Sequence, residues 1–205
     1  MCRLVWSYVL GFSLILSPIQ AASVWTPIAS QLELSVVRID VHREGSRSGH
    51  CTGFVINAEK NYVLTAAHCD GEKLLVDGAP AYRIFIEEQK DIMVLQVPGV
   101  EGGVAVTLAK RDPKRGDEVA SFGYGLGLED PVFRIAHVSN TGLNIEGLSG
   151  PFILVDSAFV GGQSGGPVVN TRGEVVMIVQ RGSDGFGLGI GVEIIRSKIR
   201  RYLPA

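Results

Sequence analysis

Three short segments of the sequence contain the residue types that nucleophilic acyl transfer requires. Ser164 lies in the run Gly-Gly-Gln-Ser-Gly-Gly-Pro, His68 in Thr-Ala-Ala-His-Cys, and Asp91 in Lys-Asp-Ile-Met-Val-Leu. A serine hydroxyl attacks a carbonyl carbon efficiently when a base takes its proton and an acid holds that base in one tautomer. Glycines beside the serine permit the sharp turn that directs backbone N–H groups at a developing oxyanion. The three segments therefore predict a Ser-His-Asp site.

Asp91 has one rival for the role of the acid. Asp77 precedes Gly78, and an Asp-Gly pair between apolar runs is typical of a turn. Asp91 instead opens an apolar run, and we assign it as the acid.

Short apolar runs between turn-forming residues make up most of the chain after residue 34, at the 8–12-residue spacing typical of barrels and sandwiches. The first series of expected strands is Ser35–Val41, Gly53–Ile56, Tyr62–Thr65, Leu74–Val76, Tyr82–Ile86 and Ile92–Val97. The second series is Val119–Phe122, Val132–Val138, Phe152–Asp156, Pro167–Val169, Val175–Gln180 and Leu188–Val192. A glycine-rich and then charged stretch separates them. The predicted architecture is all-β: two antiparallel barrels side by side, over about 35–98 and about 117–192.

The two ends of the globular part have helical patterns. Ile195, Ile199 and Tyr202 recur at helical spacing among basic residues, which predicts an amphipathic helix over about 193–203. Its positive charge lies toward the C-terminus, where the helix dipole favours it. A short leading helix is expected over Ser23–Gln31.

The first residues have the composition of a secretory signal peptide. Arg3 is the only charge before an apolar run from Leu4 to Leu16, and small residues follow it. That run is shorter than the roughly 20 apolar residues that a membrane span needs. We expect cleavage after Ala21, so that residues 1–21 are the signal peptide and 22–205 form one exported domain, periplasmic or extracellular and free of the membrane.

Composition, cysteine content and histidine spacing argue against nucleic-acid binding and against a metal site. The chain has 205 residues, of which 46% are hydrophobic, and a net charge of −2. This charge does not indicate the basic surface that nucleic-acid binding requires. Removal of the leader leaves Cys51 and Cys69, a pair that an exported chain usually oxidises to a disulfide. A zinc site is the competing interpretation, and it lacks a C-x₂-C spacing. His42, His50 and His137 show no paired ligand spacing, so no metal or cofactor is expected.

With these motifs in the order His, Asp, Ser, the sequence resembles the chymotrypsin/trypsin superfamily. Within it, the sequence is similar to the protease domain of the bacterial secreted HtrA (high-temperature requirement) proteases. The resemblance extends over nearly all of the chain after the leader. It implies a chymotrypsin-like double barrel in which Ser164 is the nucleophile, His68 the general base and Asp91 the orienting acid. The amides of Gly162 and Ser164 would form the oxyanion hole.

The resemblance also implies a disulfide and a substrate pocket. In the family a disulfide braces the strand before the histidine, and Cys51 and Cys69 fall at those places. The pocket would include Ala158, Phe159 and Val179. Ala158 stands where trypsin has an aspartate, so cleavage is expected after small or medium apolar residues, in protein or peptide substrates.

Two departures from the family pattern bear on regulation. Gln163 stands where trypsin-like zymogens carry an aspartate, so the ion pair with a newly cut N-terminus is not expected. No segment resembles a PDZ domain, and a monomer is expected. The alternatives to an endopeptidase are a non-catalytic binding module with the same fold and a serine esterase.

Two glycine-rich stretches are expected to lie near the substrate. Gly123–Leu128 lacks the last glycine of a phosphate loop and is expected to be a turn near the cleft. The alternating glycines from Gly185 to Gly191 predict a strand that borders an open pocket.

Overall fold

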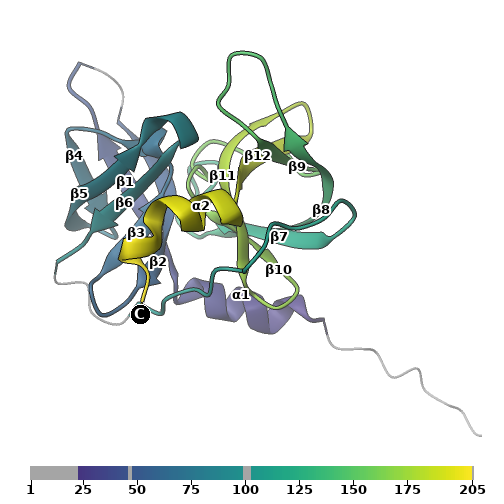
Figure 1. Cartoon of the computed structure of the whole chain (residues 1–205). Helices are drawn as coiled ribbons and strands as arrows, with labels where there is room; N and C mark the ends of the chain where they lie inside the picture. The colour runs from purple at the N-terminus through teal and green to yellow at the C-terminus, as the bar shows by residue number, and fades with distance from the viewer. Residues whose placement is uncertain (1–22, 46–47, 99–102, 205) are drawn as a thin grey trace, which may run out of the picture.

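The computed structural model describes residues 23–45, 48–98 and 103–204, so the predicted signal peptide, residues 1–21, lies outside the described residues. Two β-barrels lie side by side, and the helix α2 (Val192–Ile199) runs across from one to the other (Figure 1).

Each barrel is a closed ring of six antiparallel strands. Barrel one contains β1 (Val36–His42), β2 (Gly49–Asn57), β3 (Tyr62–Thr65), β4 (Lys73–Val76), β5 (Ala79–Glu87) and β6 (Ile92–Gln96). Barrel two contains β7 (Glu118–Gly123), β8 (Val132–Leu143), β9 (Phe152–Val155), β10 (Pro167–Asn170), β11 (Val175–Ser183) and β12 (Phe186–Gly191). The ring order is β1-β2-β3-β6-β5-β4 in barrel one, and β7-β8-β9-β12-β11-β10 repeats it in barrel two. The predicted double barrel is confirmed.

Strands β3 and β6 are buried on both faces. Val63 and Met93 belong to the interior of barrel one, whereas their chain neighbours Leu64 and Val94 belong to the core shared with barrel two. Successive side chains of a strand point to opposite faces, so a strand between two cores must be apolar at every position. This is why these strands read as continuous apolar runs in the sequence.

The two terminal helices join the barrels. α1 (Trp25–Glu33) buries Trp25, whose indole N–H donates to Glu118 of β7 at 2.8 Å. At the other end, Tyr202 in the 3₁₀ turn η3 (Arg200–Tyr202) donates its hydroxyl hydrogen to the carbonyl of Ile84 in β5 at 3.1 Å and packs its ring against Tyr62. The chain that leaves barrel two is thereby fixed to barrel one.

The strand ends differ from the sequence-based expectation. β8 continues to Leu143 rather than ending at Val138, and β11 continues to Ser183 rather than Gln180. Most of the additional residues are polar or glycine and continue backbone pairing beyond the core, whereas Leu143 at the end of β8 packs against the core. Apolar patterning marks only the buried part of such a strand.

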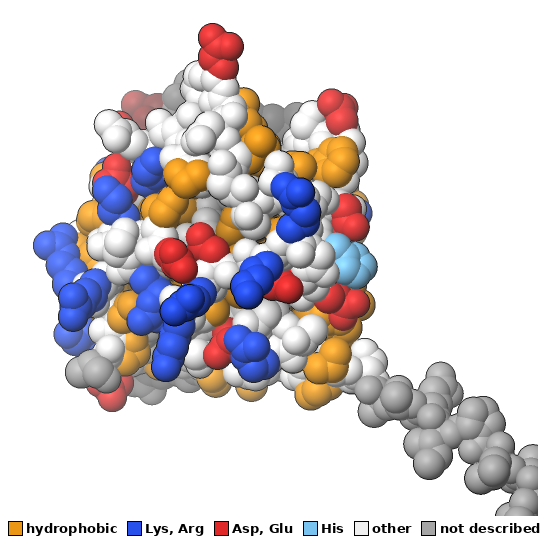
Figure 2. Space-filling model, turned by 45° about the vertical axis from the view of Figure 1, so that its right-hand side comes forward, with side chains coloured by type: hydrophobic (Ala, Val, Ile, Leu, Met, Phe, Trp, Pro, Cys, Tyr) orange, Lys and Arg blue, Asp and Glu red, His pale blue; other side chains and the backbone are white. Residues whose placement is uncertain are grey.

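Basic and acidic side chains occur together on the surface. Lys and Arg side chains gather at one edge of the face drawn in Figure 2, with Asp and Glu side chains among and beside them. In α2, Lys198 forms an ion pair with Glu87 at 2.9 Å. No helix within the described ranges is long and apolar enough to cross a membrane.

The two cysteines left after leader removal lie together in barrel one. Cys51 of β2 and Cys69 of the 3₁₀ turn η1 (Ala67–Cys69) have their Sγ atoms 2.04 Å apart, at the distance of a covalent bond. They join the strand that precedes the site to the turn that carries His68.

We expect the exported protein to contain this disulfide. A non-reduced proteolytic digest of residues 22–205 should give the Cys51 and Cys69 peptides linked, and reduction should separate them. Because the bond closes a loop of 18 residues, a Cys51→Ala, Cys69→Ala double variant should lose about 3 kcal/mol of unfolding free energy. Two freely alkylated thiols in the native protein would contradict the pairing.

Candidate active site

Asp91 holds His68 by two hydrogen bonds. Oδ2 of Asp91 lies 2.7 Å from Nδ1 of His68, and Oδ1 accepts a hydrogen bond of 2.8 Å from the backbone amide of the same histidine. One carboxylate therefore fixes both the ring and the backbone of η1. With Nδ1–H donated to the carboxylate, Nε2 is left as the free acceptor, which is the tautomer that a general base needs.

The backbone of Asp91 has an unusual conformation. After the 3₁₀ turn η2 (Glu88–Lys90), Asp91 adopts a left-handed φ of 54° and then begins β6. Asp is one of the few L-residues that adopt this region, because its short polar side chain can hydrogen-bond locally, and Asp77 shares it with a φ of 47°. The conformation places the carboxylate beneath His68 at the start of a buried strand.

Asp77 has a different role. It lies in the turn between β4 and β5, and its Oδ1 accepts the amide hydrogen of Arg38 at 2.9 Å. Burial raises the pKa of the Asp77 carboxyl. The structure gives Asp77 a role in the turn and joins His68 to Asp91 alone of the two acids.

Ser164 lies in the loop between β9 and β10, at the face of barrel two that meets barrel one. Its carbonyl accepts the Thr52 amide of β2 at 2.9 Å, and its hydroxyl points at the carbonyl of Gln180 at 3.5 Å. Sγ of Cys69, the neighbour of His68, lies 3.7 Å from the same Ser164 carbonyl. Ser164 thus lies beside the turn that carries His68, and within the described residues no hydrogen bond joins the two side chains.

The loop presents two backbone N–H groups of the kind that bind an oxyanion. The amides of Gly162 and Ser164 donate to no protein acceptor among the residues that the structure describes, whereas the intervening Gln163 amide donates to Val160 at 3.1 Å. Gly162 has a φ of +98°, and a Cβ there would collide with the carbonyl oxygen of Tyr124 and the ring of His50. Only glycine fits this position.

Gln163 is enclosed within its own loop. Its side chain is 1% exposed, and Oε1 accepts the amide hydrogen of Val160 at 3.1 Å. Oε1 thus ties the side chain to the loop, whereas the buried Nε2 has no hydrogen-bond partner among the described residues. The side chain carries no charge to pair with a new N-terminus.

Gln180 is a residue of the site that the sequence analysis missed. Its carbonyl accepts from the Ser164 hydroxyl, and its Nε2 donates to the carbonyl of Lys90 at 2.7 Å. Lys90 precedes Asp91, so Gln180 of β11 contacts the Ser164 hydroxyl through its backbone carbonyl and the turn before Asp91 through its side chain. A buried polar residue at the end of the apolar run Val175–Val179 is the feature that could have identified it.

None of the three predicted pocket residues is among those that line the cleft beside His68 and Asp91, and each contacts a neighbouring segment. Phe159 is 7% exposed; its ring occupies the space beside Gly187 of β12, and its backbone lies against Gly182. The Ala158 carbonyl accepts from Arg134 at 2.6 Å. Val179 exchanges backbone hydrogen bonds with the loop after the nucleophile.

The expectation that the alternating glycines border an open pocket is wrong. A Cβ on Gly187 would meet the Phe159 ring, one on Gly189 would meet Met177, and the space beside Gly191 is filled by the Asp112 carboxylate. The strand is rich in glycine because other side chains pack against it.

The open cleft lies on the side of His68 and Asp91. It has a volume of about 440 Å³, and His68, Asp91, Leu148 and Arg181 are among the residues that line it. The segment after β7 borders the loop from the other side, since Leu126 donates its amide hydrogen to the Gly161 carbonyl at 3.0 Å. An extended chain in this cleft would pass beside the imidazole.

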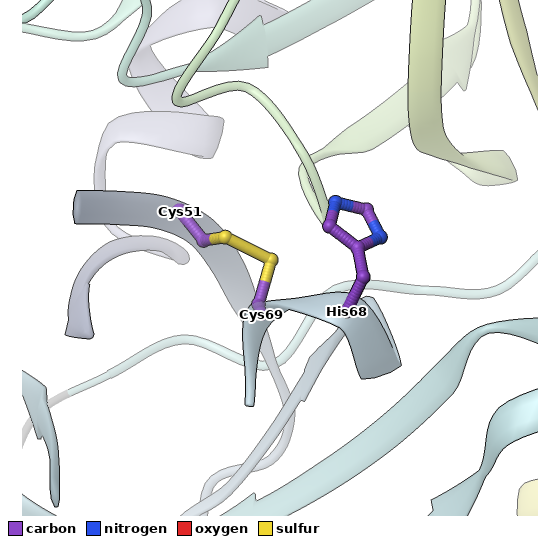
Figure 3. A group of neighbouring side chains, drawn as sticks. All are labelled: Cys51, His68 and Cys69. Carbon is purple, nitrogen blue, oxygen red and sulfur yellow. A yellow bond between two sulfur atoms is a disulfide. The ribbon is translucent and has the colours of Figure 1, made fainter. Parts of the chain in front are cut away.

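Cys51, His68 and Cys69 form a group whose ligand atoms lie within 4.8 Å of one another (Figure 3). Figure 3 shows the two cysteine side chains directed at each other, with the His68 ring pointing away from them. Sulfurs at bonding distance from each other offer no thiolate to a metal ion. In this state the group does not fit a zinc site.

Sequence comparisons match the chain to peptidases. A family model described as a trypsin-like peptidase domain matches residues 51–178. The periplasmic pH-dependent serine endoprotease DegQ of Escherichia coli (strain K12) is 32% identical over 155 residues, which are 69% of this chain and 34% of DegQ. The chain spans about a third of the length of the curated relatives that it matches.

Solved structures show the same fold. The HtrA-type protease AlgW with a tripeptide has a TM-score of 0.77 at 22% identity, covering 87% of this chain and 63% of AlgW. The Rv3671c protease from M. tuberculosis, in its active form, has a TM-score of 0.75 at 21% identity, covering 95% of this chain and 93% of that protein.

The collision at Gly162 gives a direct test of the loop. Alanine keeps the N–H at this position, but its Cβ would collide with the Tyr124 carbonyl and the His50 ring and displace that N–H. Gly162→Ala should therefore lower kcat on an activated acyl substrate by about 10²–10³-fold, the effect of losing one oxyanion donor. Gly161→Ala is the matched control, because a Cβ on Gly161 would meet nothing within 4 Å. Equal activity of the two variants would contradict the assignment of the Gly162 amide.

Proposed function

Because the chain belongs to the family of trypsin-like peptidase domains, we propose that it is an exported serine endopeptidase that uses Ser164, His68 and Asp91. The observation that carries the proposal is the double contact of Asp91 with the ring and the backbone of His68. The unpaired amides of Gly162 and Ser164 support it. Export is supported by relatives that are named periplasmic serine endoproteases and by the predicted signal peptide.

Each group would have one task in peptide hydrolysis. Nε2 of His68 takes the proton of the Ser164 hydroxyl as Oγ attacks the substrate carbonyl, and it then gives that proton to the leaving amine. The amides of Gly162 and Ser164 bind the oxyanion of the tetrahedral intermediate. Water then hydrolyses the acyl-enzyme by the same steps. Asp91 stays ionised and stabilises the imidazolium.

The hydroxyl of Ser164 must turn to begin this reaction. In the structure it points at the Gln180 carbonyl, at the long distance of 3.5 Å. Rotation of a serine hydroxymethyl group about χ1 between staggered positions is fast and requires no movement of the backbone. Catalytic hydrogen bonds commonly tighten only when substrate is bound.

Substrate would be a protein or peptide with a small apolar residue before the scissile bond. The Phe159 ring fills the space that Gly187 leaves, and this restricts the depth of the pocket. The carbonyl of Ala158 is held by the guanidinium of Arg134, so a Lys or Arg side chain there would be desolvated beside a like charge. Such a charge costs several kcal/mol. Arg181 lines the cleft beside His68 and would act on residues farther from the scissile bond.

The assignment of the acid can be tested within one set of variants. Asp91→Asn should lower kcat by about 10⁴-fold, because an amide favours the wrong imidazole tautomer. Asp77→Asn is the matched control and should stay within a few-fold of the parent. Ser164→Ala gives the residual kcat without the serine hydroxyl, which should be about 10⁶-fold below that of the parent. Near-normal turnover of Asp91→Asn together with loss in Asp77→Asn would refute the assignment.

Specificity can be read from the cleavage of a denatured peptide library. We expect cleavage after Ala and Val, with Lys and Arg disfavoured by at least about 10²-fold in kcat/KM. Phe159→Ala should extend cleavage to Leu and Met, whereas Phe186→Ala, which removes an exposed ring from the same strand as Gly187, should not. Cleavage chiefly after Lys or Arg would contradict the pocket, and cleavage after Asp or Glu would assign Arg134 a direct role.

A further inference from the structure

Thr52 of β2 is fully buried, and each of its polar atoms forms a hydrogen bond. Its amide donates to the Ser164 carbonyl at 2.9 Å, and its hydroxyl donates to the Gly162 carbonyl at 2.8 Å. The same hydroxyl accepts the amide hydrogen of Tyr124 at 2.9 Å, and the Thr52 carbonyl accepts the hydroxyl of Thr65 at 2.8 Å. One residue of barrel one thus binds both residues whose amides face the reaction.

The Gly162 carbonyl is the part of the loop that most needs such support. Glycine has the widest choice of backbone conformations, so nothing intrinsic to Gly162 holds its φ at +98°. A hydrogen bond to its carbonyl oxygen restricts rotation of the peptide unit that joins Gly162 to Gln163. The Thr52 amide restricts the other end of the pair at Ser164. The Gly162 N–H belongs to the peptide unit before the 162–163 unit, and the Ser164 N–H belongs to the unit after it. The Thr52 hydroxyl thus holds the peptide between the two donors, and the Thr52 amide holds the peptide that follows them. With these neighbouring planes held, the two N–H groups keep one relative orientation before substrate arrives.

The surroundings of Thr52 reinforce this arrangement. His50, two residues earlier on the same face of β2, has Nε2 3.1 Å from the Tyr124 carbonyl. Since a carbonyl only accepts, His50 must donate from Nε2. Tyr124 is therefore held through its amide by Thr52 and through its carbonyl by His50, and its carbonyl oxygen in turn bounds the space beside Gly162.

We propose that Thr52 is a positioning residue of the oxyanion hole, whose hydroxyl orients the Gly162 and Ser164 donors without contacting the reacting atoms. The inference rests on the function proposed above. Oxyanion donors accelerate the reaction because they are oriented in advance and need no reorganisation in the transition state. Loss of the Thr52 hydroxyl should therefore weaken binding of the transition state more than binding of the substrate.

The test compares Thr52→Val with Thr52→Ser. Valine keeps the shape of threonine and removes the hydroxyl, so kcat should fall by about 10–100-fold, less than for loss of a donor itself, while KM stays within about twofold. The inhibition constant of a peptide boronic acid, which forms a tetrahedral adduct on the serine, should rise by the same factor as kcat/KM falls. Thr52→Ser restores the hydroxyl and should recover most of both values.

Two controls separate positioning from general stability. Ile195→Val removes a methylene from the buried face of α2 away from the loop and lowers Tm without altering the site. Ser121→Ala removes a buried hydroxyl that has no hydrogen-bond partner in the described structure and should leave kcat unchanged.

Three results would overturn the inference: normal kcat in Thr52→Val, an equal loss in Thr52→Ser, or an equal loss in Ile195→Val at the same fall in Tm. A parent protein without any turnover would refute the proposed function and this inference with it. An active parent with an equally active Thr52→Val variant would refute the positioning role alone.

Discussion

β2 of barrel one hydrogen-bonds directly to the loop of barrel two that carries Ser164, and the remaining parts of the site are placed relative to this contact. Thr52 binds Gly162 and Ser164, and Thr65 at the end of β3 binds Thr52, only three residues before His68. The contact is so close that Gly165 has no room for a side chain, since a Cβ would collide with Thr65 and with the Thr52 backbone. Ser164 and His68, which are 96 residues apart in the chain, are placed near each other by backbone and hydroxyl groups of the adjacent strands β2 and β3.

A second set of contacts keeps the barrels in register. Gln180 of β11 reaches the Lys90 carbonyl beside Asp91, and Tyr202 beyond α2 docks on β5. Misplacement of a catalytic group by about 1 Å can lower the rate of an enzyme about 10²-fold. An active site formed by two barrels therefore requires contacts that hold the barrels in one relative position. Within this framework Asp91 combines a left-handed backbone with two hydrogen bonds to His68.

The sequence predicted the double barrel, which the structure confirms, and three chemical groups whose catalytic roles stay a prediction. Strands such as β3 and β6 are buried on both faces and read as apolar runs, and Ser164, His68 and Asp91 lie in distinctive local motifs. The roles of Thr52 and Gln180 could not be predicted, because they depend on which carbonyl of the other barrel each side chain meets. The alternating glycines before α2 misled for a related reason. A glycine in a strand indicates that another group packs closely against the backbone there, but it does not identify that group. The fold shows that the groups are the side chains of Phe159 and Met177 rather than substrate.

In the proposed mechanism, Asp91 and His68 on one barrel activate Ser164 on the other. The most direct measurement is the rate at which a fluorophosphonate probe modifies the folded protein, with the modified residue located by mass spectrometry. We expect one labelled residue, Ser164, and a labelling rate that falls by orders of magnitude in His68→Ala. A probe that does not react, that labels another residue, or that labels Ser164 equally fast without His68 would contradict it.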